Sequence, residues 1–221
     1  MPAAALIFDM DGTMVDSMPF HARSWAEFTR RHGIGIAIDE VLRRTTGRTG
    51  VECIRELMGH DLSETRALEL VNEKEVVYRE LFGPAFREVA GFRAFAAAAR
   101  DHGLKLAVAT AGDRHNIAFT LKHLELPAAP DVVVGGDEGL RGKPEPDLFL
   151  ESARRLRLPP SACVVFEDAV FGIEAARRAG MRAVALCTSH RPDELNGAHV
   201  LARVPDFNAL LDSGFLDRLQ A

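Results

Sequence analysis

The chain has 221 residues, 47% of them hydrophobic and 27% charged, which fits one globular domain or a domain with a modest insert. Its formal net charge of −5 argues against a nucleic-acid partner, which would require a basic face. The three cysteines are widely spaced and form no metal-ligand pair, and the first apolar run is too short for a signal peptide or a membrane span. We therefore expect a cytoplasmic protein that has no membrane partner and is a monomer by default, with a dimer left open.

The first predicted element is a short buried strand at residues 6–8, which stops at Asp9. Between residues 16 and 82 apolar residues recur at helical spacing, and glycines divide this stretch into separate helices, as in the sets Trp25 and Phe28, and Leu68, Val71 and Tyr78. After Gly91 the pattern alternates between strands and helices. Strands are predicted at residues 104–110, 132–134, 163–166 and 183–186, and helices at 114–124, 146–155 and 169–179.

Strands that alternate with helices predict an α/β fold, namely a Rossmann-like parallel sheet with helices on both faces. The helical stretch interrupts this pattern directly after the first strand, so it is expected to form an inserted helical cap. We assign residues 1–15 and 90–221 to the α/β core and residues 16–89 to the cap, which is expected to determine substrate specificity.

Polar residues follow four of the predicted strands, where a parallel sheet binds its ligands. Each group alone has an ordinary structural explanation, such as a helix cap or a solvated lysine. Four groups at four strands together predict a functional site. They are Asp9-Met10-Asp11-Gly12-Thr13, Thr110-Ala111-Gly112, Gly142-Lys143-Pro144 and Glu167-Asp168.

The residue types in these groups favour phosphate chemistry. Asp9, Glu167 and Asp168 would repel one another unless a cation were bound, and Mg²⁺ prefers such oxygen ligands. Thr110 and Lys143 suit a dianionic phosphate. A carboxylate can act as a nucleophile, and a second acid two residues later, here Asp11, can transfer protons. Gly12 allows a sharp turn beside the ligand.

Two other ligand-binding loops do not fit the spacing. An EF-hand loop needs three alternate oxygen ligands before its glycine, whereas only two aspartates precede Gly12. A P-loop needs Gly at the position of Asp137 and Ser or Thr at the position of Pro144.

These motifs resemble those of the haloacid dehalogenase superfamily along the whole chain. The resemblance implies that Asp9 accepts the phosphoryl group and that Asp11 is the general acid and base. It implies that Mg²⁺ is held by Asp9, the backbone carbonyl of Asp11 and Asp168, with Glu167 assisting. Thr110 and Lys143 would hold the transferring phosphate, and the neighbouring substrate-binding candidates are Gly12, Thr13, Ala111 and Gly112. An acid at the position of Asp11 distinguishes enzymes that cleave phosphate esters from the dehalogenases of the superfamily.

The helical insert resembles the small cap of the β-phosphoglucomutase-like branch. By this resemblance His21 contacts the acid/base, Arg48 belongs to the substrate loop, and Lys74 lies near the substrate phosphate. The chain departs from the mutase pattern at Gly50, where the mutase loop carries an arginine.

Three functional hypotheses follow. The first is a phosphatase that acts on a small phosphorylated metabolite, in particular a sugar phosphate. The second is a phosphomutase of the β-phosphoglucomutase type, which returns the phosphate to another hydroxyl group of the substrate. The third is a catalytically idle binding protein on the same fold, which would be expected to have lost Asp9, Asp11 or Lys143.

Overall fold

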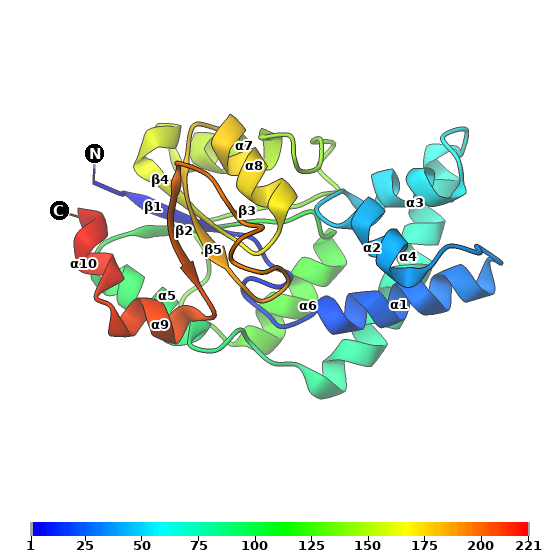
Figure 1. The fold of residues 1–221 in the computed structure, drawn as a ribbon, viewed down its shortest axis with the longest axis horizontal. Helices are drawn as coiled ribbons and strands as arrows, with labels where there is room; N and C mark the ends of the chain where they lie inside the picture. The colour runs from blue at the N-terminus through cyan, green and yellow to red at the C-terminus, as the bar shows by residue number, and fades with distance from the viewer. Residues whose placement is uncertain (1, 221) are drawn as a thin grey trace.

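Six parallel strands form one sheet within the α/β part of the molecule, on the left in Figure 1. The computed structural model describes residues 2–220. The strand order is β3-β2-β1-β4-β5-β6, so β1 lies between the two strands that lead to opposite edges. The strands are β1 (Ala5–Phe8), β2 (Lys105–Ala109), β3 (Val132–Val134), β4 (Cys163–Glu167), β5 (Arg182–Leu186) and β6 (Val200–Val204).

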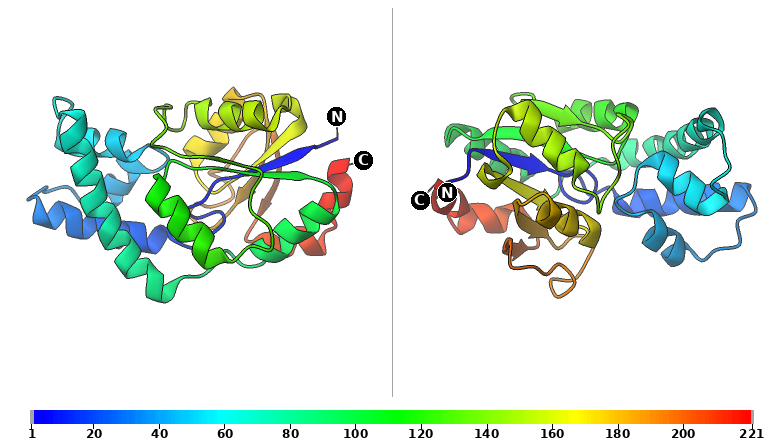
Figure 2. Two further views of the ribbon diagram at one scale, coloured as in Figure 1. Left: turned by 180° about the vertical axis from the view of Figure 1, so that it is seen from behind. Right: turned by 90° about the horizontal axis from the view of Figure 1, so that it is seen from above.

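The strands alternate their side chains between two apolar layers, each covered by helices (Figure 2). Leu6 and Phe8 of β1 pack toward one layer, and Ala5 and Ile7 pack toward the other. The first layer contains α5 (Phe92–Asp101), α6 (Arg114–Leu124), α9 (Phe207–Asp212) and α10 (Phe215–Gln220). The second contains α7 (Asp147–Leu156) and α8 (Val170–Arg178). This burial on both faces explains why β1 is apolar throughout.

Four further helices form a group of their own beyond the end of the sheet (Figure 1). They are α1 (Met18–Arg31), α2 (Ile38–Thr45), α3 (Gly50–Met58) and α4 (Glu64–Phe82), and we call them the helical unit. The unit has its own apolar core, which includes Trp25, Phe28, Val41, Ile54 and Leu70.

Two chain segments connect the helical unit to the sheet, and they run side by side. The Asp16 N–H donates to the Arg87 carbonyl at 3.1 Å, and the Val89 N–H donates to the Met14 carbonyl at 3.0 Å. The Asp16 carboxylate and the Arg87 guanidinium form an ion pair at 2.6 Å. The 3₁₀ turn Gly83–Ala85 leads from α4 into the second segment, and another, Pro160–Ala162, precedes β4.

The structure confirms the predicted α/β fold with its parallel sheet, and the predicted elements agree with it to within two residues. Outside the helical unit, one strand and three helices were not predicted, namely β6, α5, α9 and α10, and the two 3₁₀ turns were not predicted either. Within α4, Leu68 was expected on the apolar stripe with Val71 and Tyr78 but is 47% exposed. The buried face of α4 passes instead through Ala67, Leu70, Val71, Lys74 and Tyr78.

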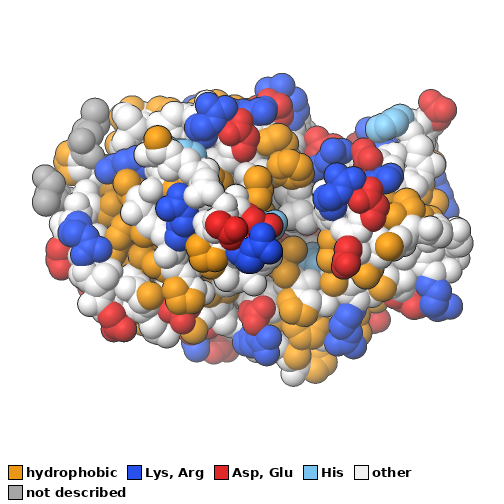
Figure 3. Space-filling model, viewed as in Figure 1, with side chains coloured by type: hydrophobic (Ala, Val, Ile, Leu, Met, Phe, Trp, Pro, Cys, Tyr) orange, Lys and Arg blue, Asp and Glu red, His pale blue; other side chains and the backbone are white. Residues whose placement is uncertain are grey.

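The surface carries a repeated arrangement of ion pairs at the ends of four helices. In α1, α2, α7 and α8 a glutamate accepts hydrogen bonds from the arginines three and four residues later. These hydrogen bonds lower the pKa of each glutamate to about 2. Acidic and basic side chains are accordingly interspersed over the face shown in Figure 3. Between residues 2 and 220 the protein has no helix of the length and apolarity that crossing a membrane requires.

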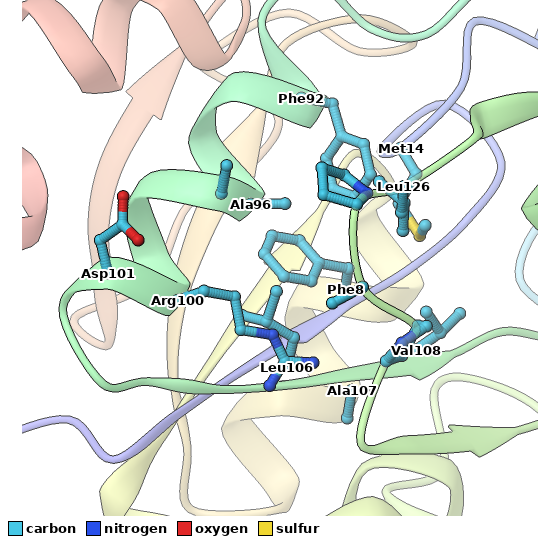
Figure 4. A pocket seen from close by; sticks show the side chains of 14 residues that line it. Phe8, Met14, Phe92, Ala96, Arg100, Asp101, Leu106, Ala107, Val108 and Leu126 are labelled. Carbon is cyan, nitrogen blue, oxygen red and sulfur yellow. The ribbon is translucent and has the colours of Figure 1, made fainter.

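An apolar cavity of about 160 Å³ lies between α5 and β2 (Figure 4). Phe8, Met14, Phe92, Leu106 and Val108 contribute to its wall. Its charged residues, Arg100 and Asp101, lie on the last turn of α5, and Arg100 is engaged by Asp131. This cavity therefore offers hydrophobic volume rather than groups for chemistry.

Candidate active site

The polar residues predicted from the sequence meet at the carboxyl ends of the central strands. Asp9 follows β1, Thr110 follows β2, and Glu167 and Asp168 lie at the end of β4. Because β1 is the strand at which the sheet order reverses, this is the usual position of a ligand crevice in an open α/β sheet. A cavity of about 110 Å³ lies between these residues and the helical unit, and Lys143 also lines it.

Three buried carboxylates form the floor of this cavity. Oxygen atoms of Asp9, Glu167 and Asp168 all lie within 4.8 Å of one another. The Lys143 Nζ donates to Asp9 Oδ1 and to Glu167 Oε1, each at 2.5 Å. One ammonium group cannot neutralise three carboxylates, so the cluster carries excess negative charge in a buried position.

The pKa values of the cluster reflect this excess. Burial raises the pKa of Asp9 to about 7, although Lys143 opposes the shift. Burial, together with the charges of Glu167 and Asp9, raises the pKa of Asp168 well above its usual value. Burial disfavours the charged form of Lys143, but Asp9 and Glu167 outweigh this effect and raise its pKa. Lys143 therefore stays positively charged.

The cluster fits a hard divalent cation. Asp168 Oδ2 is buried and makes no hydrogen bond of normal geometry within the described chain, although the nearby Ser189 hydroxyl lowers the pKa of this carboxyl group and a buried carboxylate oxygen normally has a partner. The other Asp168 oxygen accepts a long hydrogen bond of 3.4 Å from the Thr13 hydroxyl. An orphaned oxygen among like-charged oxygen donors is what a magnesium-type ion would satisfy.

Gly12 is required by the backbone geometry beside this cluster. Its φ of +81° lies in the left-handed region, and a Cβ atom at this position would approach Asp168 Oδ2 to 2.1 Å. Any residue with a Cβ atom at position 12 would therefore displace the Asp168 carboxylate.

Asp11 lies in a different environment from Asp9. Its Oδ1 accepts hydrogen bonds from the Ser17 hydroxyl at 2.7 Å and from the Tyr78 hydroxyl at 3.1 Å, and His21 Nε2 lies 3.0 Å away. Burial would raise the pKa of Asp11, but His21, Ser17 and Tyr78 outweigh burial and lower it to about 2. The His21 ring stacks on Tyr78 with centroids 3.9 Å apart, which holds both partners of Asp11 together.

A chain of polar contacts leads from His21 across the helical unit to α6. The His21 Nδ1 lies 2.8 Å from Lys74 Nζ, which also donates to Glu75 Oε1 at 2.9 Å. The Glu75 Oε2 accepts a hydrogen bond of 2.7 Å from the Asn116 amide. Burial would raise the pKa of Glu75, but Lys74, His21 and Asn116 outweigh it and lower the pKa. Helix α4 is thereby joined to α6 by a buried, ionised group.

The remaining predicted residues are distributed unevenly around the cavity. Ala111, Gly112, His21, Arg48 and Lys74 line it, and Arg48 pairs with Glu56 at 3.1 Å. The Thr110 hydroxyl accepts a hydrogen bond from the Gly112 N–H at 3.0 Å. The structure does not bring Gly12 or Thr13 into the cavity: Gly12 lines a neighbouring cleft, and Thr13 is fully buried behind Asp168. The Asp11 carboxylate lies outside the acidic cluster, so only its main-chain carbonyl stays a predicted metal ligand.

Four residues of the site were missed in the sequence, namely Ser17, Glu75, Tyr78 and Asn116. Ser17 has the pattern of a helix N-cap, and Tyr78 has that of an apolar helix face. Glu75 stands in the charged run beside Lys74, which is typical of a solvated surface. Asn116 carries no sequence signal, because its partner lies 41 residues away in the chain.

Comparisons with known proteins agree with this geometry. The model of the haloacid dehalogenase-like hydrolase family matches residues 3–180. Validoxylamine A 7'-phosphate phosphatase of Streptomyces hygroscopicus subsp. limoneus is 34% identical over 89% of this chain and 92% of its own. A fructose-1-phosphate phosphatase of Escherichia coli is 36% identical over 82% of this chain and 95% of its own. The crystal structure of a hydrolase from Pseudomonas syringae covers all of both chains with a TM-score of 0.86 and 28% identity.

Proposed function

The chain belongs to the haloacid dehalogenase-like hydrolases, and on this basis we propose that it is a magnesium-dependent phosphatase of a small phosphorylated sugar. The observation that carries the proposal is the separation of two neighbouring carboxylates. Asp9 lies in the acidic cluster with Lys143, whereas Asp11 is held apart by Ser17 and Tyr78. Two carboxylates in different environments can take different roles in one reaction. The activities named for the two phosphatase relatives support a sugar-like substrate.

The reaction proceeds in two displacements. The Asp9 carboxylate attacks the phosphorus atom, and the bond to the ester oxygen breaks. Asp11 is ionised in the free site, where its pKa is about 2, so it must take up a proton as the substrate binds, and it donates that proton to the ester oxygen. Asp11 then takes a proton from a water molecule, whose oxygen attacks the phosphorus and breaks the bond to Asp9, which releases inorganic phosphate. The contacts with Ser17 and Tyr78 fall on Asp11 Oδ1, so we assign the transferred proton to Oδ2.

Asp9, Glu167 and Asp168 would hold the magnesium ion, with the Asp11 carbonyl as a further ligand. When bound, the ion supplies positive charge that offsets the negative charge of the transferring phosphate. Lys143 contributes a second, fixed positive charge, and Thr110 and Ala111 line the cavity beside it. These residues would hold the phosphate against Asp9.

We propose that residues 16–89 act as a cap over the substrate and that residues 1–15 and 90–221 form the catalytic core. His21, Arg48, Lys74 and Glu75 reach the cavity from the helical unit, which supports this division. The monomeric state, the cytoplasmic location and the lack of nucleic-acid or membrane partners stay predictions from the sequence.

Phosphate release from a panel of phosphorylated sugars and polyols, with magnesium and with chelator, tests the function. We expect magnesium-dependent release from one or a few of them. Asp9→Asn should abolish this release, because an amide does not accept the phosphoryl group. Full turnover in excess chelator would contradict the metal assignment, and full turnover of the variant would contradict the nucleophile.

A phosphomutase is the alternative on the same core, and it would have to grip a second phosphate. On the side of the helical unit the two cations that line the cavity, Arg48 and Lys74, are paired with Glu56 and Glu75. This pairing favours the phosphatase. Conversion of β-glucose 1-phosphate to glucose 6-phosphate with a bisphosphate primer, without phosphate release, would favour the mutase instead.

A further inference from the structure

We propose that Glu75 makes this site select substrates that carry a single phosphate and an uncharged, hydroxyl-rich far end. The inference rests on the proposed phosphatase function and narrows its substrate class. It assigns to Glu75 the role of a specificity residue at the opening of the cavity.

The position of Glu75 is the first argument. The active-site cavity adjoins two larger clefts, a first of about 570 Å³ and a second of about 520 Å³. The cavity and the first cleft share four lining residues, Gly50, Glu75, Ala111 and Gly112. The cavity and the second cleft share Met18, Leu42, Thr46 and Ala169. Among these shared residues Glu75 alone carries a charge. A substrate whose phosphate lies at Asp9 and whose far end extends into the first cleft passes this carboxylate.

The charge balance is the second argument. The described lining of the cavity holds His21, Arg48, Lys74 and Lys143, and each is paired with a carboxylate. The three arginines that line the first cleft, Arg55, Arg114 and Arg141, are also paired with carboxylates. A second phosphate at the opening would find no unpaired cation in this lining and would face the ionised Glu75. Like charges brought together in a partly desolvated site are strongly unfavourable, and specificity commonly arises from such repulsion.

The hydrogen-bonding capacity of Glu75 is the third argument. Its two oxygens each accept one hydrogen bond, from Lys74 and from Asn116. Carboxylate oxygens have about four acceptor sites in total, so Glu75 can accept further bonds from hydroxyl groups. Lys74 and Asn116 also fix the orientation of the carboxylate, which is therefore preorganised for a sugar hydroxyl.

The test compares two substrates that differ only at the far end. Fructose 1-phosphate and fructose 1,6-bisphosphate are assayed with the magnesium-loaded protein, and the site of cleavage is read from the product. We expect kcat/KM for release of the 1-phosphate to be at least roughly tenfold higher for the monophosphate. Glu75→Gln keeps the shape but removes the charge. It should reduce this preference by roughly tenfold, mainly through a lower KM for the bisphosphate.

Glu73→Gln is the matched control. Glu73 lies on the same helix, two residues earlier, but pairs with His32 at 3.1 Å and does not line the cavity. Its substitution should leave the preference unchanged. Equal kcat/KM for both compounds in the wild type, or an unchanged preference in a folded Glu75→Gln protein, overturns the role of Glu75 but leaves the phosphatase intact. Should Glu75→Gln not fold, Glu75→Asp takes its place, because the shorter side chain withdraws the charge from the opening and should lower the preference in the same direction. Absence of release from every monophosphate of the panel overturns the phosphatase function, and the selectivity with it.

Discussion

Ser17 precedes the first residue of α1, where a serine ordinarily caps the helix by accepting a main-chain hydrogen bond. Here its side chain makes no capping bond and instead donates to Asp11 at 2.7 Å. Proline in the first turn of α1 reduces the need for a cap, because proline has no N–H group to satisfy. Ser17 therefore does not cap the helix, and its hydroxyl group is available to hydrogen-bond Asp11, the proposed acid/base residue.

Replacement of Ser17 tests this reading. Ser17→Ala should lower kcat by roughly tenfold, because a hydrogen bond to a charged group is lost. Ser63→Ala is a control, since the Ser63 side chain does cap its helix by accepting from the Arg66 N–H. It should cost about 1 kcal/mol of unfolding free energy and leave kcat unchanged. Unchanged kcat in Ser17→Ala, measured by steady-state phosphate release, would show that the hydroxyl does not act through Asp11.

Asp11 itself should be more sensitive. Asp11→Asn keeps an acceptor oxygen for Ser17 and Tyr78 but cannot exchange a proton. We expect kcat to fall by roughly 10²–10⁴, the usual contribution of a general acid and base. A substrate with a good leaving group, such as p-nitrophenyl phosphate, should lose less, because its first displacement needs no proton. An equal loss with both substrates would indicate a role other than proton donation.

Helix α4 joins the helical unit to α6 through Glu75 and Asn116, and this contact should be sensitive to acid. The pKa of Glu75 is lower in the folded protein than its ordinary value of 4.5. The group therefore contributes stability above the ordinary pKa, and this contribution is lost as the pH falls through the folded pKa. The unfolding free energy of the wild type should decline more steeply than that of Glu75→Gln as the pH falls below about 5. Denaturant titrations at several pH values measure both slopes, and parallel slopes would argue against an ionised Glu75.

The accuracy of prediction from sequence differed between elements for physical reasons. Strand β1 has a distinctive pattern because both of its faces are buried. Strand β6 lies at the edge of the sheet, and its residues, Arg203 among them, alternate between half-buried and exposed. It therefore lacks the continuous apolar run by which the other strands were recognised. Helix α5 is a run of alanines flanked by Phe92, Phe95 and charged residues, and we assigned no element to it. The acidic motifs were recognisable because they follow strands directly, whereas Glu75 and Asn116 meet only through folding.

At the scale of the whole molecule, the acidic cluster links metal binding to stability. Magnesium that binds the folded state alone should stabilise it by about 2.7 kcal/mol at a concentration 100 times its Kd. We expect the Tm, measured by differential scanning calorimetry, to rise with magnesium and to fall with chelator. Asp168→Asn should remove most of this rise in Tm, because the carboxylate that it replaces carries Oδ2, the oxygen without a hydrogen bond of normal geometry in the structure. An equal rise in the variant would place the ion elsewhere.

The glutamate–arginine clusters at the ends of α1, α2, α7 and α8 have a consequence for the behaviour of the protein in heat. Water solvates charged groups less favourably as the temperature rises, so the cost of bringing a carboxylate and two guanidinium groups together decreases. These clusters lie in the last turns of the helices, which normally fray first, so they oppose fraying more effectively as the temperature rises. Dissolved salt screens the same exposed charges. The tolerance of these four helices to heating is therefore expected to depend on ionic strength, and dilute buffer should preserve them longest.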